Sequence, residues 1–348
     1  MPALRSESAT VLLVAPHGLD EPRPADGCDY RVLLLQRSLK ASFMPGMYVF
    51  PGGITEEPLD AQLADEYNTS LLRVTAVREL FEEAGVLLAA PDRPLRSGFR
   101  RHLLDMTLPV LPAAKASTWR SKVNASPDAF ADLAAAVEAA GGRMAFDTLA
   151  PWARWITPEF EPRRYDATFF VGALDAVDAD ALHCDRETIA SKWMTPGEAL
   201  AAAADGTLML APPQWLCLHE MATFTALEDL MEYAHAGRCI APIMPNWCTT
   251  PDGTPYSALP GDADHSQHPG PSPGSRNRMY MRIRGGVSVV EMRVSTDLAD
   301  GPAWIPDADR SSSPIVAAAQ RAFANRVVVS PDNPDSPPPP VTSTQAKL

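Results

Sequence analysis

The stretch LLRVTAVRELFEEAGV, residues 71–86, places three carboxylates on one face of a predicted helix. Glu79, Glu82 and Glu83 stand at positions i, i+3 and i+4, so their side chains meet on neighbouring turns. Carboxylates that crowd together repel unless a cation lies among them, and a site built from oxygens alone suits Mg²⁺ or Mn²⁺. The stretch therefore predicts a divalent-metal site, with a solvated acidic helix face as the alternative.

The same stretch contains signals that would fix and end this helix. Arg78 lies four residues before Glu82 and could hold its carboxylate through a bidentate pair. An apolar stripe that includes Val74 and Phe81 would pack on a core, and Gly85 is a typical C-terminal breaker.

Residues 78–86, RELFEEAGV, resemble the second half of the Nudix box, REUXEEXGU, in which U is aliphatic. The first half differs, because Gly53 lies 25 positions before Arg78, eleven more than the pattern has. Ser70 stands where the pattern has its first glutamate. We expect the inserted polar run, residues 58–69, to form a loop before the helix.

A second resemblance lies just upstream of the box. Residues 33–53, LLLQRSLKASFMPGMYVFPGG, are similar to the signature that precedes the Nudix box in coenzyme A diphosphatases. This resemblance implies substrate-binding roles for Arg37, Gly52 and Gly53. Glycine permits a phosphate to approach the backbone closely, but a turn that ends a strand would use the same residues.

Two further segments extend the resemblance. The runs WITP and PRRYDATFF, within residues 151–174, are similar to the peroxisomal acyl-coenzyme A diphosphatase branch of the Nudix superfamily, whose members also carry an insertion in the box. Arg163 and Arg164 could clamp a phosphate, or form a surface pair at a strand entry. Glu187 lies where Nudix enzymes often have a loop acid, and we expect it to be a further metal ligand or the general base, with Asp185 in reserve; a solvated acid in a helix or loop is the alternative.

The resemblance covers about residues 8–295 and implies an α/β fold: a Nudix α/β/α sandwich with a mixed sheet. It implies hydrolysis of the pyrophosphate of coenzyme A or acyl-coenzyme A, giving adenosine 3′,5′-bisphosphate and (acyl-)4′-phosphopantetheine. Arg78 would orient Glu79, which would act as a ligand with Glu82 and Glu83; which glutamate deprotonates the water stays open. The alternatives are another nucleoside diphosphate derivative, such as NADH or ADP-ribose, and a Nudix-fold binding module without turnover.

Composition and periodicity predict the organisation of the remaining chain. We expect strands over residues 8–15 and 30–36, and helices over about 127–140 and 213–236. We expect a hairpin whose strands, 278–284 and 287–294, flank Gly285-Gly286. The predicted divisions are a Nudix domain over 1–236 with a helical insertion over about 91–150, a C-terminal appendage over 237–326, and a disordered Pro/Ser-rich tail over 327–348.

The charge balance and cysteine usage limit the partners and the compartment. The 348 residues carry a net charge of −13, which disfavours non-specific binding to nucleic acid or to an anionic membrane. No apolar run is long enough to span a membrane, and the five cysteines form no CxxC pair, which favours a reducing interior. His265 and His268 lie in a Ser/Pro/Gly loop, where we expect exposed side chains; metal ligation is the alternative.

The final tripeptide, Ala346-Lys347-Leu348, resembles the small-basic-leucine address that the peroxisomal import receptor reads. The Pro/Ser-rich residues before it would leave it accessible. We therefore expect a peroxisome or a related organelle, with the cytoplasm as the alternative.

Overall fold

The computed structural model describes most of the chain before residue 297. The described residues are 6–18, 22, 24–41, 44–91, 103–104, 113–159, 161, 163–176, 188–237, 240–251, 255–270, 274–284 and 289–296. The predicted tail and the final tripeptide lie outside this part. Within it, no helix has the length and apolar character needed to cross a membrane.

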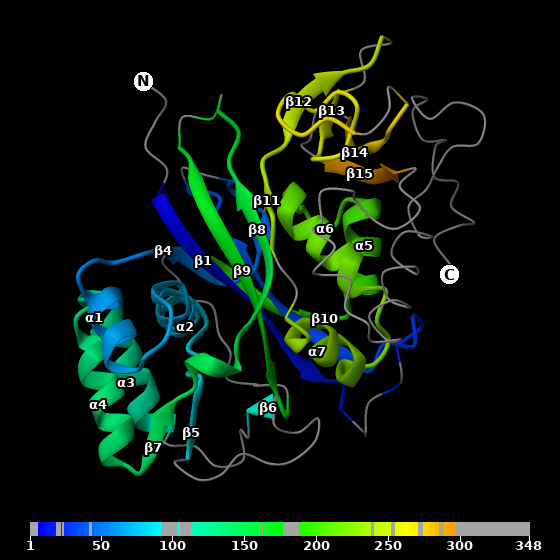
Figure 1. The fold of residues 1–348 in the computed structure, drawn as a ribbon. Helices are drawn as coiled ribbons and strands as arrows, with labels where there is room; N and C mark the ends of the chain where they lie inside the picture. Colours follow the sequence, from blue (N-terminus) through cyan, green and yellow to red (C-terminus); the bar gives the residue numbers. More distant parts are fainter. Residues whose placement is uncertain are drawn as a thin grey trace.

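A mixed sheet forms the centre of the molecule, with strand order β10-β2-β1-β9-β8-β11 (Figure 1). Its strands are β1 (Ser6–Pro16), β2 (Tyr30–Arg37), β8 (Ala150–Ile156), β9 (Tyr165–Leu174), β10 (Thr188–Met194) and β11 (Pro242–Ile243), with short strands β3 (Tyr48–Val49), β4 (Gly52–Ile54) and β6 (Leu103–Leu104) alongside. β1 and β9 pair in parallel, whereas β2, β4 and β10 add antiparallel pairs. The prediction of two strands at 8–15 and 30–36 is confirmed.

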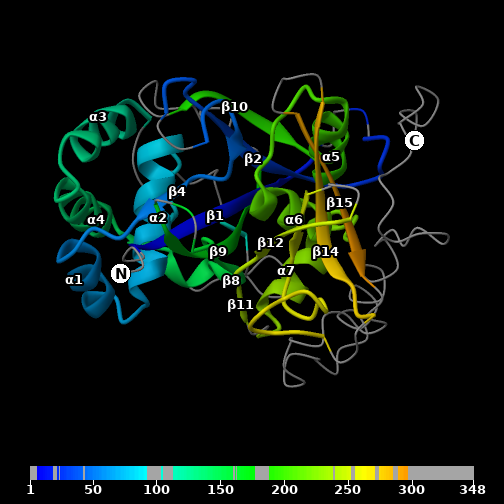
Figure 2. The same cartoon turned by 90° about the horizontal axis from the view of Figure 1, so that it is seen from above.

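Helices cover both faces of this sheet, as Figure 2 shows from above. One layer contains α1 (Leu59–Glu66), α2 (Leu71–Ala84), α3 (Ala113–Ala125) and α4 (Ala129–Ala139), and the other contains α5 (Pro196–Asp205), α6 (Pro212–Met221) and α7 (Leu227–His235). Successive residues of β1 supply the two cores: Val11 packs with α2 and α4, while Leu12 packs with α6 and α7. Such a strand is buried on both faces, which explains its continuous apolar run. The expected α/β/α sandwich with a helical insertion is confirmed.

Two expectations about helices were wrong. The run 58–69 is not a loop, because Leu59 and Leu63 are buried one helical turn apart and fold it into α1. The single helix expected over 213–236 is two helices, α6 and α7. The break arises from a tertiary contact: the Asp29 carboxylate accepts a hydrogen bond from the Leu227 N–H at 2.7 Å and so starts α7.

A second, antiparallel sheet follows the central one in the sequence. It consists of β12 (Asn246–Thr249), β13 (Pro255–Ala258), β14 (Asn277–Arg284) and β15 (Val289–Thr296). The pairing of β14 with β15 confirms the predicted hairpin. A small pair, β5 (Ala89–Pro91) with β7 (Gly142–Met144), and the 3₁₀ turn Phe146–Thr148 complete the fold.

The loop between β13 and β14 overturns the expectation that both of its histidines are exposed. His265 is only 1% exposed, and its Nε2 lies 2.9 Å from the Met244 carbonyl oxygen. The His268 backbone N–H donates to His265 Nδ1 at 2.9 Å, so Nε2 carries the proton in the neutral ring. Beside it, the buried Asp262 forms an ion pair with Arg278 at 2.6 Å.

Candidate metal and active site

Helix α2 begins and ends at the residues that its sequence indicates. Ser70 is the N-cap, and its side chain accepts a hydrogen bond from the Arg73 N–H at 3.3 Å. Gly85 adopts a left-handed φ of 75°, and its N–H donates to the Phe81 carbonyl at 2.9 Å, which confirms the predicted breaker. Ser70 therefore starts the helix at the position where the box pattern has a glutamate.

Arg78 is the centre of a hydrogen-bond network around the candidate metal ligands. Its side chain is 1% exposed, and its NH1 donates to Glu79 Oε1 and Glu82 Oε1, each at 3.0 Å. Its NH2 donates to the Ile54 carbonyl at 2.9 Å. The predicted contact with Glu82 is thus confirmed, although through one nitrogen rather than two. One guanidinium therefore orients two of the three glutamates and joins them to β4.

The bidentate partner of Arg78 is Asp60, a residue that the sequence did not reveal. Arg78 Nε donates to Asp60 Oδ1 at 2.9 Å and NH2 donates to Asp60 Oδ2 at 3.0 Å. Asp60 is fully buried, and it also accepts from the Thr75 hydroxyl at 2.8 Å and from the Glu56 N–H at 2.9 Å. It lies in α1, within the inserted run 58–69. The site therefore has an additional acid from α1, although Ser70 replaces the first glutamate of the box pattern. The i, i+4 pair of leucines in this run was the available signal for its helix.

The two glycines of β4 bring the backbone against the other carboxylates. The Gly52 N–H donates to Glu83 Oε2 at 3.0 Å. A Cβ atom on Gly53 would lie 2.5 Å from the Glu79 carboxyl carbon, so only glycine fits there without displacing that side chain. These contacts place Gly52 and Gly53 at the candidate ligands.

Burial and mutual repulsion change the acidity of these glutamates. Burial raises the pKa of Glu79 to about 8; the Arg78 charge opposes this effect, and the nearby carboxylates of Glu83 and Glu82 add to it. Burial also raises the pKa of Glu82, again against Arg78. A divalent cation among these carboxylates would favour their deprotonated form and so offset the effect of burial.

The donor set fits a hard divalent cation. It offers carboxylate oxygens and no thiol, as Mg²⁺ and Mn²⁺ prefer. In the part of the chain that the structure describes, no three acidic, histidine or cysteine side chains converge as a metal cluster. Arg78 and the Gly52 N–H hold oxygens of the three glutamates. Binding a cation would therefore require these side chains to turn toward it.

The remaining predicted site residues divide between the site, the framework and undescribed segments. Arg37 ends β2 opposite Thr188, the first residue of β10, and its N–H donates to the Met47 carbonyl at 2.9 Å. Glu187 and its alternative Asp185 lie outside the described residues, so their roles stay predictions. Arg164 is buried and its Nε donates to the Thr157 carbonyl at 3.2 Å, which indicates a structural role; the phosphate clamp stays a prediction for Arg163.

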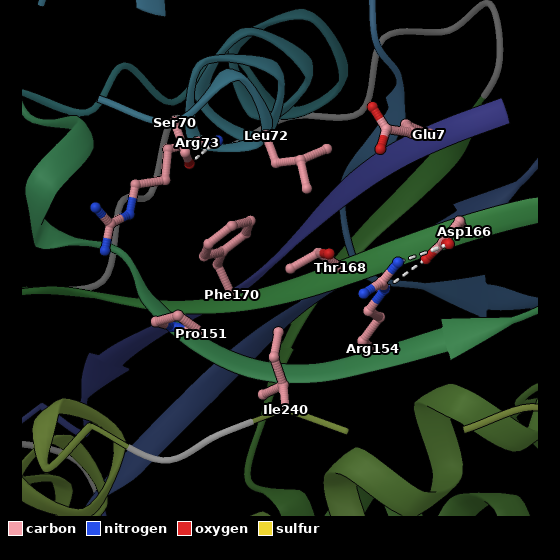
Figure 3. A pocket seen from close by; sticks show the side chains of 10 residues that line it. All are labelled: Glu7, Ser70, Leu72, Arg73, Pro151, Arg154, Asp166, Thr168, Phe170 and Ile240. Carbon is pink, nitrogen blue, oxygen red and sulfur yellow. Dashed lines mark hydrogen bonds and ion pairs between the residues drawn. The ribbon is translucent and has the colours of Figure 1, made fainter. Parts of the chain in front are cut away.

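A separate pocket of about 470 Å³ lies between the first turn of α2 and the face of β8 and β9 (Figure 3). Arg154 Nε and NH2 donate to the two Asp166 oxygens at 2.7 and 2.9 Å on its wall. The N-cap Ser70 and the α2 residues Leu72 and Arg73 contribute to the lining. None of the three glutamates lines this pocket, so it does not belong to the candidate metal site.

Comparisons with known proteins show the family to which the chain belongs. A family model described as the NUDT19 Nudix domain matches residues 5–70 and 57–221. This chain belongs to the NUDT19 Nudix family. The family match confirms the predicted Nudix hydrolase class, and residues 57–70 fall in both matched segments, which is where the insertion lies.

Members of this family from vertebrates are similar over most of the chain. The acyl-coenzyme A diphosphatase NUDT19 of Gallus gallus is 30% identical over 312 residues, covering 76% of this chain and 80% of that protein. The protein of the same name from Homo sapiens is 29% identical over 287 residues, covering 69% and 73%. A Nudix hydrolase structure from Alicyclobacillus acidocaldarius matches with a TM-score of 0.51 and 22% identity, covering 66% of this chain and 96% of that one, and supports the fold.

Proposed function

We propose that this Nudix hydrolase cleaves the pyrophosphate of coenzyme A or acyl-coenzyme A. The products would be adenosine 3′,5′-bisphosphate and (acyl-)4′-phosphopantetheine. The observation that carries the proposal is the placement of Glu79 and Glu83 against Gly53 and Gly52, with Arg78 holding Glu79 and Glu82. The names of the vertebrate relatives support the choice of substrate.

The chain's own residues would bind the cofactor and manage the proton. Glu79, Glu82 and Glu83 would hold Mg²⁺ or Mn²⁺, which when bound neutralises phosphate charge and makes water a better nucleophile. Glu79, which Arg78 orients, would be one candidate for the general base that accepts the proton of the attacking water, and Glu187 is the alternative base. Arg78 contacts only one oxygen of Glu79 and one of Glu82, so it would limit how far both side chains turn while their other oxygens reach the cation.

A substrate panel tests this function. Coenzyme A, acyl-coenzyme A, dephospho-coenzyme A, NADH and ADP-ribose would each be incubated with Mg²⁺ or Mn²⁺, and the products separated by chromatography. We expect the highest kcat/KM for coenzyme A or acyl-coenzyme A, with a lower value for dephospho-coenzyme A if Arg163 reads the 3′-phosphate. Faster cleavage of NADH or ADP-ribose would favour the other substrate class, and no turnover of any compound would favour a binding module.

We also propose that Ala346-Lys347-Leu348 is read by the peroxisomal import receptor. What supports this is the tripeptide itself, whose pattern resembles a receptor-read address rather than a membrane anchor. A fluorescent protein fused to the N-terminus would be imaged in a host with peroxisomes, with and without these three residues. Peroxisomal signal that depends on the tripeptide is expected; cytoplasmic signal from both forms would reject the proposal.

A further inference from the structure

The C-terminal end of α2 is held by a residue from the helical insertion. Arg120 of α3 donates from Nε to the Glu82 carbonyl at 3.1 Å and from NH2 to the Glu83 carbonyl at 2.6 Å. Asn124, one turn further along α3, adds a longer contact from its side-chain amide to the Glu82 carbonyl at 3.5 Å. These are the backbone carbonyls of two candidate metal ligands.

Such carbonyls need a partner from outside the helix. The last carbonyls of any helix lack a donor within it, and here the Gly85 N–H donates to Phe81 and leaves the two glutamate carbonyls open. A guanidinium at this position also places positive charge at the negative end of the helix dipole. Arg120 therefore stabilises the turn from which Glu82 and Glu83 project.

The glycine that ends α2 also leaves room for this guanidinium. A Cβ atom on Gly85 would lie 3.3 Å from Arg120 NH1, which is tighter than ordinary contact. Helix α3 is itself packed on the core, because Val123 is fully buried in the cluster that contains Val77 and Phe81 of α2. The guanidinium is thus held from both helices.

We propose that Arg120 is a positioning residue that fixes the metal-ligand turn of α2 through its backbone. This inference rests on the proposed function, since it assigns Glu82 and Glu83 to metal binding. A ligand must be held to within about half an ångström to bind well, and residues that orient ligands change metal affinity by about tenfold to a hundredfold when lost. The helical insertion would then be part of the catalytic apparatus rather than an addition to it.

The test compares Arg120→Ala and Arg120→Lys with Lys122→Ala, which removes the same charge from the same helix where Lys122 lies over Trp119. Mn²⁺ binding would be followed through the electron paramagnetic resonance signal of free Mn²⁺, and hydrolysis measured across Mn²⁺ concentrations. We expect Arg120→Ala to weaken Mn²⁺ binding by about tenfold, Arg120→Lys to fall between, and Lys122→Ala to match the unsubstituted protein. At saturating Mn²⁺, the substrate KM should change less than twofold.

The outcomes separate this proposal from the proposed function. Unchanged Mn²⁺ affinity in folded Arg120→Ala, or a loss of thermal stability alone, would overturn the positioning role and leave the function intact. Mn²⁺ binding without coenzyme A turnover in the unsubstituted protein would reject the substrate, while the comparison of affinities would still decide the role of Arg120. Absence of Mn²⁺ binding in the unsubstituted protein would overturn both. If Arg120→Ala does not fold, Arg120→Lys and Asn124→Ala replace it, and unchanged affinity in both would overturn the proposal.

Discussion

At the scale of single residues, we expect the carboxylate charges of α2 to determine the rate of hydrolysis, whereas its apolar stripe packs the helix on the core. Replacing Glu82 or Glu83 with Gln removes a ligand charge but keeps the shape, and the amide oxygen at position 83 can still accept from the Gly52 N–H. We expect kcat to fall at least about a hundredfold in each variant, with little change in unfolding temperature. Steady-state hydrolysis with Mn²⁺ checks this, and Glu232→Gln on the exposed face of α7 is the matched control. Near-normal turnover in both variants would reject the metal face.

Asp60 carries the second residue-scale prediction. Asp60→Asn removes the charged bidentate partner of the buried Arg78 guanidinium and leaves only Glu79 and Glu82 to balance its charge, so we expect a loss of about 2 to 3 kcal/mol in the free energy of unfolding, with reduced turnover. Urea denaturation measures the loss, and Asp65→Asn, exposed on the same helix, should change stability by less than about 0.5 kcal/mol. Equal stabilities for the two variants would show that Arg78 does not depend on Asp60.

At the scale of elements, the junction between β4 and α2 allows a precise test. Gly53→Ala would place a methyl group 2.5 Å from the Glu79 carboxyl carbon, so the side chain must move away from Gly53. Since misplacement of a catalytic group by about 1 Å can cost a hundredfold in rate, we expect kcat to fall at least about tenfold in a folded protein. Steady-state hydrolysis measures turnover, and circular dichroism shows whether the variant folds. Gly141→Ala is the spatial control, because a Cβ there meets nothing within 4 Å. The positive φ of Gly141 adds backbone strain to that variant. Unimpaired turnover would mean that Glu79 does not need its observed position.

The elements differ in how well the sequence alone predicts them. β1, β2, α2 and the β14–β15 hairpin were predictable, because their periodicity or their glycines are local signals. The division between α6 and α7 depends on Asp29, about 200 residues away in the chain, so no local pattern contains it. Asp60 was missed for the same reason: its partner Arg78 is 18 residues away and lies on a different helix. Local patterns therefore identified the glutamates but not the groups that hold them.

At the scale of the whole molecule, the second sheet should respond to acid through His265. Burial lowers the pKa of His265 below its ordinary 6.5; the Met244 carbonyl opposes this, His268 reinforces it, and Asp262 opposes it. The unfolded chain then binds the extra proton more readily, so the contribution of His265 to stability is complete above about pH 6.5 and declines as pH falls below it. We expect the unfolding temperatures of the unsubstituted protein and His265→Asn to differ most at pH 8 and to converge toward pH 5.

Thermal unfolding across this pH range provides the measurement. His268→Asn is the control, because it keeps the backbone N–H that donates to His265. Its decline in unfolding temperature toward pH 5 should persist, somewhat reduced because His268 no longer reinforces the lowering of the His265 pKa. A constant difference between His265→Asn and the unsubstituted protein from pH 8 to pH 5 would contradict the prediction.

The short strand β11, at the start of the C-terminal appendage, protects an edge of the central sheet. Pro242 and Ile243 pair with Arg154 and Trp155 and so cover part of the outer edge of β8 in the central sheet. An uncovered edge presents unpaired N–H and C=O groups that another chain can extend, which leads to aggregation. Removing the residues after 237 would therefore remove β11 and leave β8 as an exposed edge strand, with which a strand of a neighbouring molecule could pair.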